Sequence, residues 1–465
     1  MLTANQDKLF REAIRQARAE ALAAVGDPIQ LSSKPLDVQV RHEPGMEPEA
    51  WIAESGFVVK RIGLETGKTN QVYRGHGGPV TSLAFYTTRS RRRNLMISAS
   101  WDKSFKVWDT RTKACLSTTV GHTDFIKTVS VIPELDVLVT GSSDKDLRVW
   151  DLSHLDDLEN PSPNDAVPAP EPPRAGAAPP LAVAKNPLPL LISLKSHTRP
   201  IERLASFAIT TSPINEGDDM GGKTGKIGLV SADSMGVLKI WQLERDAVNG
   251  SFAGVEQCSV KHHELAIYDL VLGPEGEMWT ASADNSVLLS TFVPSSPATA
   301  PTPVLRIPHP GQTRALLSLP ISVPPLQAPY LLTTSTGAED LIRVFDLTDE
   351  VLDPDPKREV RREWKGLPGL HSGDAVPGCV REIEGHTNEI VQLAAYVVKN
   401  SELGTNEVWI LSASLDGTLK RWKWTEMLEQ QREKLVLVEV KPQEEASLLT
   451  EEEERELAEL MGDDD

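Results

Sequence analysis

The stretch that decides the fold runs from residue 75 to residue 151, where one pattern occurs twice. The landmarks of the first copy are Gly75-His76, S-A-S-W-D at 98–102 and V-W-D at 107–109. The landmarks of the second copy are Gly121-His122, T-G-S-S-D at 140–144 and V-W-D at 149–151. Between the landmarks lie short apolar runs separated by tight turns, which indicates a repeated unit of β-strands.

Residues 104–109 show why the unit is built of strands. Phe105, Val107 and Asp109 alternate with Lys106 and Trp108, which is the period-two pattern of a strand. A single four-stranded sheet cannot bury both of its faces, whereas several such sheets stacked in a ring can. The repeat therefore predicts a closed ring of sheets.

The two copies resemble the WD-repeat family, and the resemblance covers most of the chain. In that family a His, a Ser or Thr of the second strand, a turn Asp and the Trp indole form one hydrogen-bonded chain. The sets that this resemblance implies here are His76, Ser98, Asp102, Trp108; His122, Thr140, Asp144, Trp150; and His386, Ser412, Asp416, Trp422. A buried polar network of this kind fixes one packing, so we interpret these His–Asp pairs as structural and not catalytic.

Further copies are degraded. The third copy keeps His197, Ser231 and Trp241, with Met235 in place of the turn Asp. The fourth keeps His262 or His263, Thr280 and Asp284, with Ser290 at the Trp position. The fifth has His309, Ser335, Glu339 and Phe345. Residues 36–73 lack Gly-His but have the same four runs, with Ile62 at the Trp position.

Together these segments predict an all-β fold: a seven-bladed WD-repeat β-propeller with an N-terminal helix and an acidic C-terminal tail. We expect an N-terminal helix and linker at 1–35, the propeller at 36–441 and the tail at 442–465. The amphipathic helix at 3–25 either packs on its own propeller or binds a partner. The alternating run Lys434–Val440 supplies either the outer strand of the last blade or the inner strand of the first.

Insertions fall only between the first and second strands or between the third and fourth strands of a blade. These connections emerge on one face of a propeller, so the opposite face has short loops throughout. Three long, Pro-rich insertions, at 153–187, 294–303 and 347–378, are predicted to be disordered.

Composition limits the classes of function. The net charge of −19 argues against a general nucleic-acid binder, and residues 444–465 hold eleven acidic residues against one Arg. Three widely spaced cysteines indicate a reducing compartment, so we expect the cytoplasm, the nucleus or both. No stretch has the pattern of a signal peptide or a membrane span.

Two groups of residues are candidates for binding partners. On the short-loop face, Trp101, Lys103, Lys145 and Leu415 flank turn Asp residues and Phe125 follows a Gly-His loop. On the long-loop face, Arg91, Arg92 and Arg93, with Arg89, form a basic cluster. This cluster binds phosphate, RNA or an acidic partner, meets the chain's own acidic tail, or is a solvated loop.

Three further motifs suggest other functions. Residues 217–224 match the P-loop pattern G-x-x-x-x-G-K-T, but a P-loop must open a helix and none is predicted there. His262-His263 has no third ligand at metal spacing. Trp108-Asp109-Thr110-Arg111 matches the W-D-x-R of WD-repeat substrate receptors of cullin–RING ubiquitin ligases.

The sequence therefore predicts a non-catalytic protein-interaction scaffold in an intracellular multiprotein complex, without a cofactor or metal. We expect it to be monomeric within a hetero-complex. The alternative is a substrate receptor of a cullin–RING ligase.

Overall fold

The structure is a computed structural model. It describes residues 16–42, 46–158, 182–210, 223–246, 249–273, 276–320, 326, 328–336, 340–347, 376, 378–399 and 406–429. The chain divides into two units, 1–429 and 430–465, and the description concerns the first. The predicted tail, the run Lys434–Val440 and the first part of the N-terminal helix lie outside the described residues.

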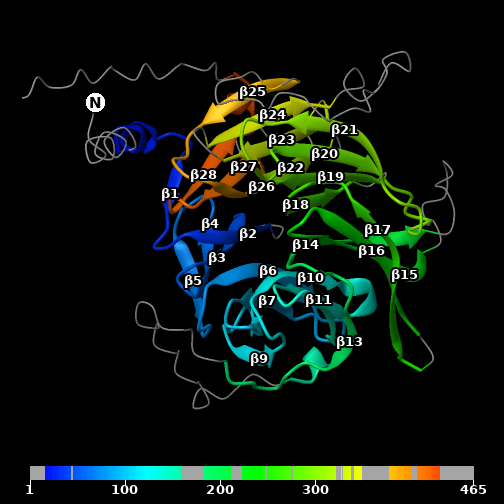
Figure 1. Cartoon of the computed structure of the whole chain (residues 1–465). Helices are drawn as coiled ribbons and strands as arrows, with labels where there is room; N and C mark the ends of the chain where they lie inside the picture. Colours follow the sequence, from blue (N-terminus) through cyan, green and yellow to red (C-terminus); the bar gives the residue numbers. More distant parts are fainter. Residues whose placement is uncertain are drawn as a thin grey trace, which may run out of the picture. The chain divides into compact units, whose positions relative to one another are not determined.

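The described residues form seven antiparallel four-stranded sheets, here called blades 1 to 7 (Figure 1). Blade 1 consists of β2 (Pro35–Arg41), β3 (Glu49–Glu54), β4 (Val58–Gly63) and β5 (Thr69–Arg74). Blade 2 consists of β6 (Val80–Thr87), β7 (Asn94–Ser100), β8 (Ser104–Asp109) and β9 (Cys115–Val120). Blade 3 consists of β10 (Ile126–Ile132), β11 (Val137–Ser142), β12 (Leu147–Asp151) and β13 (Leu190–Leu194).

The remaining blades repeat this order. Blade 4 consists of β14 (Ile201–Thr210), β15 (Lys223–Asp233), β16 (Val237–Arg245) and β17 (Phe252–Lys261). Blade 5 consists of β18 (Ile267–Leu272), β19 (Glu277–Ser282), β20 (Ser286–Thr291) and β21 (Thr302–Pro308). Blade 6 consists of β22 (Thr313–Leu319), β23 (Tyr330–Ser335), β24 (Leu341–Asp346) and β25 (Cys379–Glu384). Blade 7 consists of β26 (Ile390–Lys399), β27 (Asn406–Ser414), β28 (Thr418–Lys423) and β1 (Pro28–Gln30).

The first strand of each blade packs against the first strand of the next, and β26 packs against β2, so the ring is closed (Figure 1). The predicted seven-bladed propeller is confirmed. Short helices lie outside the blades: η1 (Pro133–Leu135), η2 (Ser153–Asp156) and α3 (Trp424–Glu429). Residues 16–22 are also helical.

Blade 7 is completed by the N-terminal strand β1, which pairs with β28 in the register Ile29↔Leu419. The prediction that Lys434–Val440 is the outer strand of this blade is therefore wrong. The alternative position, the inner strand of blade 1, is filled by β2. Strand β1 could not be predicted from the sequence, because three residues are too few to show an alternating pattern.

The segment before β1 is held against blade 7. The ammonium group of Lys420 donates hydrogen bonds of 2.7 Å to the carbonyl oxygens of Leu22 and Val25. Asp27 pairs with Arg421 at 2.6 Å. Of the two roles predicted for the N-terminal helix, packing on its own propeller therefore holds for its described part.

Apolar side chains of neighbouring blades form the core between them. Leu95, Ile97 and Phe105 of blade 2, for example, share one buried cluster with Leu138 and Trp150 of blade 3. Fully burying each such side chain contributes about 1.5–3 kcal/mol before the entropy cost of folding. Because each blade buries its faces against two neighbours, the ring is the smallest unit with a complete core.

Side chains of the innermost strands also join the blades. The Leu83 amide of blade 2 donates a 2.7 Å hydrogen bond to Asp37 of blade 1, and the Leu316 amide of blade 6 donates one of 2.8 Å to Asp269 of blade 5. Burial raises the pKa of both carboxyls, although Arg203 opposes the shift. These bonds satisfy amides that would otherwise be buried without a partner.

The three Pro-rich insertions lie, as predicted, between the third and fourth strands of blades 3, 5 and 6. Residues 294–303 are described, and the prediction of disorder there is wrong: the Ser296 amide bonds to the Val293 carbonyl, the Thr299 amide bonds to the Ser296 carbonyl, and Thr302 begins β21. Turn-forming hydroxyl residues organise this Pro-rich segment. The prediction is also wrong at both ends of the first insertion, where residues 153–156 form η2 and Lys185 pairs with Thr118. Residues 159–181 and 348–375 of the other two insertions lie outside the described part of the chain.

Candidate functional site

The His–Asp pair of blade 2 belongs to a buried hydrogen-bonded network. His76 Nδ1 lies 2.9 Å from Asp102 Oδ2, and His76 Nε2 lies 2.7 Å from the Ser98 hydroxyl. The Trp108 indole donates a 2.9 Å hydrogen bond to the same hydroxyl. Because Ser98 is fully buried, its hydroxyl has no access to a substrate.

Blades 3 and 7 have the same network. The His–Asp distance is 2.9 Å in both blades. The Trp indole donates to the hydroxyl at 3.0 Å in blade 3 and 2.8 Å in blade 7. The residues are His122, Thr140, Asp144, Trp150 and His386, Ser412, Asp416, Trp422, which are the sets that the family resemblance implied.

The carboxylates of these networks are ionised. Burial by itself raises the pKa of Asp102, but the charge and hydrogen bond of His76 outweigh it and hold the pKa well below its usual range. The same balance, with His386 as the partner, lowers the pKa of Asp416 to about 2. The carboxylates of Asp102 and Asp416 therefore stay ionised over the physiological pH range.

Blade 4 has a complete network, so the prediction that Met235 replaces its Asp is wrong. Asp233 lies 3.2 Å from His197 Nδ1, while Ser231 bonds both His197 and Trp241. Asp233 is the last residue of β15 and reaches the histidine from the strand end. In the clear repeats the Asp follows the Ser or Thr by four residues, as Asp102 follows Ser98. Applied to Ser231, this spacing indicated Met235, whereas the Asp of this network lies two residues earlier.

In blade 5 the two adjacent histidines have different roles. His263 takes the network position, 2.9 Å from Asp284 and 2.8 Å from Thr280. His262 stands where blades 2, 3 and 7 have Gly, and its Nδ1 lies 3.2 Å from the Ser290 hydroxyl. Ser290 pairs with Met278 across the sheet, as Trp108 pairs with Met96, so it does occupy the Trp position.

Blade 6 has a reduced network. His309 Nε2 lies 3.4 Å from the Thr333 hydroxyl, so the predicted Ser335 is not the partner. Ser335 instead accepts a hydrogen bond from the buried Arg343. Phe345 is at the Trp position, packed edge-on to His309, and Glu339 lies outside the described residues.

On the short-loop face, the structure brings together two predicted residues from different blades. Trp101 in the β7–β8 turn and Phe125 before β10 stack with ring centroids 5.0 Å apart and an angle of 18° between the planes. Trp101 is 41% exposed and Phe125 is 36% exposed. Trp101 therefore does not simply cover its own blade, since its ring packs across to the next one.

The other predicted residues of this face differ in their exposure. Lys145 is exposed and Lys103 is partly exposed, each in the turn between the second and third strands of its blade. Leu415 is partly buried against the core between blades 7 and 1. Sequence reasoning missed Met235 and Leu265, which are exposed apolar residues of the same loop set in blades 4 and 5. Recognising Asp233 as the network Asp would have identified Met235 as an outward turn residue.

On the long-loop face, the basic cluster divides into paired and unpaired arginines. Arg89 pairs with Asp136 at 2.8 Å, and Arg93 pairs with Asp109 at 3.1 Å. Arg91 and Arg92 are exposed and line a groove that also includes Arg111, the Arg of the W-D-x-R match. The sequence did not show that these two motifs share one surface.

The other motifs do not form a site in the described part of the chain. Lys223 begins strand β15 and no helix follows it, while residues 217–222 lie outside the described residues. No group of three or more His, Cys, Asp or Glu residues there is arranged to hold a metal ion. No helix among the described residues is both long and apolar enough to cross a membrane.

Comparison with known proteins agrees with this geometry. The family of the WD domain, G-beta repeat, matches residues 67–109, 113–151 and 377–423, which carry the networks of blades 2, 3 and 7. With these matches and its seven blades, the chain belongs to the WD-repeat β-propeller family. Propellers of this family generally mediate protein interactions.

Among similar proteins is an uncharacterized WD repeat-containing protein of Schizosaccharomyces pombe, 28% identical over 56% of this chain and 59% of that protein. Mitochondrial division protein 1 of Neurospora crassa is 36% identical over 19% of this chain and 13% of its own length. Nuclear distribution protein PAC1 of Arthroderma otae is 42% identical over 13% of each chain. The matches therefore span less than two thirds of these relatives.

Proposed function

We propose that this protein is a non-catalytic scaffold of an intracellular multiprotein complex, and that it binds a partner through its short-loop face around Trp101 and Phe125. The stacked, exposed aromatic pair carries this proposal. Aromatic residues held rigidly are typical anchors of protein interfaces, because little side-chain entropy is lost when they are covered.

The exposed area of the pair is large enough to matter. Side chains of this size present about 200 Å² each, so exposed fractions of 41% and 36% leave roughly 150 Å² for a partner. Burying that area contributes about 4 kcal/mol before the costs of association. Met235 of blade 4 and Leu265 of blade 5 are further exposed apolar residues in loops of the same face.

The pair is also well supported. The Trp101 amide donates to the Pro79 carbonyl at 3.0 Å, and the Phe125 carbonyl accepts from the Ser143 amide at 2.9 Å. Both are backbone bonds, so truncating either side chain leaves them in place. The side chains can therefore be tested without disturbing the buried networks.

The test is quantitative affinity purification with the full chain carrying Trp101→Ala and Phe125→Ala. We expect at least one partner to be lost, since removal of an interface anchor typically costs about 2 kcal/mol or more. The matched control is Val255→Ala with Val293→Ala, which removes exposed apolar side chains elsewhere. If the double variant unfolds at the same temperature as the unaltered chain and still retains every partner, the short-loop face is not the binding surface.

The alternative, a substrate receptor of a cullin–RING ligase, is supported by one observation. Arg111 of the W-D-x-R match is exposed on the β8–β9 loop, and its backbone amide donates a 2.9 Å hydrogen bond to the Asp109 carboxylate. Co-purification of a cullin–RING adaptor that disappears in Arg111→Ala would favour this function. Copurification of such an adaptor unaffected by the substitution would count against this role for Arg111.

A further inference from the structure

A groove of about 560 Å³ opens on the long-loop face of blade 2, between the β6–β7 and β8–β9 loops. Four arginines line it, Arg91, Arg92, Arg93 and Arg111, against one carboxylate, Asp109. These side chains give the lining a formal charge of +3 in a chain whose net charge is −19. A local charge of this sign attracts an anionic ligand.

The arginines differ in how far they are already neutralised. Arg93 pairs with Asp109 and donates a 2.7 Å hydrogen bond to the Leu158 carbonyl. The guanidinium groups of Arg91, Arg92 and Arg111 make no hydrogen bond or ion pair with any residue that the structure describes. Three cations are therefore available to a ligand.

The backbone around these cations is fixed. Asp156 of η2 accepts hydrogen bonds from the Ser90 amide at 3.0 Å and the Ser90 hydroxyl at 2.6 Å. On the other side of the groove, the Asp109 carboxylate accepts a hydrogen bond from the Arg111 amide. Holding the two loops in place reduces the entropy lost when their arginines bind an anion.

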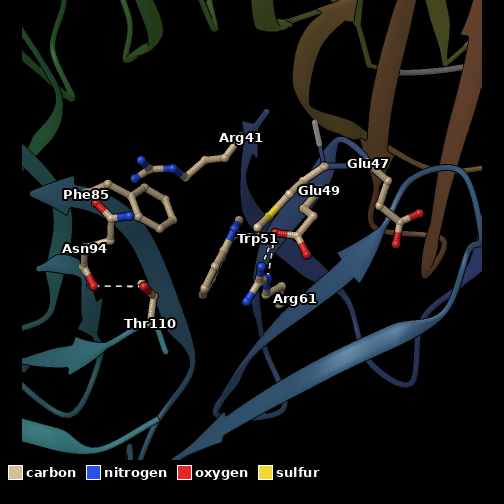
Figure 2. A pocket seen from close by; sticks show the side chains of 9 residues that line it. Arg41, Glu47, Glu49, Trp51, Arg61, Phe85, Asn94 and Thr110 are labelled. Carbon is tan, nitrogen blue, oxygen red and sulfur yellow. Dashed lines mark hydrogen bonds and ion pairs between the residues drawn. The ribbon is translucent and has the colours of Figure 1, made fainter. Parts of the chain in front are cut away.

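A second, smaller pocket adjoins the groove and shares Asn94 and Thr110 with it (Figure 2). Its walls include Trp51 and Phe85, whose rings meet edge-on at 5.2 Å. The Trp51 indole N–H is buried and has no acceptor among the described residues. An unpaired buried donor is costly, so a ligand carbonyl reaching this N–H is favoured.

We propose that the groove and this pocket bind an extended peptide of a partner protein that carries clustered anionic side chains. The anions, phosphate or carboxylate, lie against Arg91, Arg92 and Arg111, because the guanidinium fork binds either group with two hydrogen bonds. The adjoining pocket, at about 30 Å³, has room for one small group of the peptide, such as a backbone carbonyl. This site lies on the face opposite Trp101 and does not depend on the function proposed for that face.

The charges favour a peptide over a nucleic acid. Nucleic-acid affinity grows with the number of phosphates neutralised, and the described residues of the groove offer three unpaired cations. Phosphates beyond the groove would face a strongly acidic chain. A peptide needs only a short anionic cluster followed by uncharged residues.

The experiment uses the full chain and three labelled peptides that differ only at two adjacent positions, which are phosphoserine, glutamate or serine. Fluorescence anisotropy at physiological salt should show binding of the two anionic peptides but not the serine peptide. Their relative affinities tell whether phosphate or carboxylate is the preferred source of charge. Arg91→Ala with Arg111→Ala should weaken the tighter peptide by about tenfold or more.

The matched control is Lys34→Ala with Arg199→Ala, which removes the same charge from exposed side chains on the short-loop face. Its affinity should stay within about twofold of the unaltered chain, and both variants should unfold at the unaltered temperature. The proposal is overturned if the groove variant binds as tightly as the control, or if the serine peptide binds equally well. It also fails if no peptide binds up to about 1 mM, or if a short single-stranded RNA binds more tightly than either anionic peptide.

Discussion

Blade 5 allows a sharp test of how the networks are packed, because it exchanges the sizes of two facing residues. Where blades 2, 3 and 7 have Gly and Trp, it has His262 and Ser290. In blade 3 a Cβ added to Gly121 would lie 2.9 Å from the Trp150 ring, closer than real Cβ contacts. A large residue at the Gly position and an indole at the Trp position therefore exclude one another.

The structure gives the expected size of each change. Ser290 is fully buried, so Ser290→Trp should overpack the site against His262 and destabilise the protein by about 1–3 kcal/mol. His262→Gly removes the imidazole and the hydrogen-bond partner of Ser290, at a cost of about 2–3 kcal/mol. In the double variant the indole takes the vacated space and can donate to Thr280, as Trp108 donates to Ser98.

We therefore expect the double variant to lie within about 1 kcal/mol of the unaltered protein, a favourable coupling of at least about 2 kcal/mol. The assay is urea unfolding followed by far-ultraviolet circular dichroism, with the slopes compared to check that the same surface unfolds. In the matched control, Gly121→His with Trp150→Ser, blade 3 receives the blade 5 pair. If the two costs in blade 5 simply add, steric exchange does not explain its sequence.

Three further predictions concern stability. Asp233→Ala should lower the free energy of unfolding by about 1–3 kcal/mol, because it leaves buried hydrogen-bond donors unpaired. Met235→Ala should change it by no more than about 0.5 kcal/mol. Similar costs for the two variants would contradict the assignment of Asp233 to the network. Gly26 has φ +75° and its added Cβ would lie 2.5 Å from the Trp422 indole, so Gly26→Ala should cost about 2–3 kcal/mol. Gly67 has φ +66°, but its added Cβ would make only an ordinary contact, 3.7 Å from Ile29, so Gly67→Ala should cost about 1 kcal/mol. Thermal melts giving equal losses would contradict this steric account. Burial, with a smaller contribution from a nearby arginine, lowers the pKa of His309 to about 3, so its neutral form stabilises the fold above the unfolded pKa near 6.5 and this contribution is lost as pH falls toward 3, at up to about 1.4 kcal/mol per pH unit. His309→Gln should flatten that part of the pH profile of urea unfolding, and an unchanged profile would show that another group is responsible.

The sequence was sufficient for the features that repeat within a blade. Strand alternation and the Gly-His and Trp-Asp landmarks predicted the seven sheets, because each landmark side chain acts inside its own sheet at a constant spacing. Where the spacing changed, the prediction failed. Thr333 was missed because the turn of blade 6 is two residues longer, so counting ten residues back from Phe345 reached Ser335.

The sequence did not predict which strand completes blade 7 and closes the ring. The pairing of Ile29 with Leu419 joins residues from the two ends of the propeller, and no local pattern marks a strand of three residues. Tertiary contact alone decides which segment reaches the open edge of β28. Once β1 is there, the bonds from Lys420 and Arg421 hold the segment before it.

The candidate binding surfaces divide in the same way. Trp101, Phe125 and the arginines stood out in the sequence as exposed turn and loop residues of unusual type. Only the ring stacks Trp101 on Phe125, and only the arrangement of the loops places Arg91 and Arg111 in one groove. Sequence periodicity reports which face of its own strand a residue occupies, whereas these contacts depend on the geometry between blades and between loops, which periodicity does not encode.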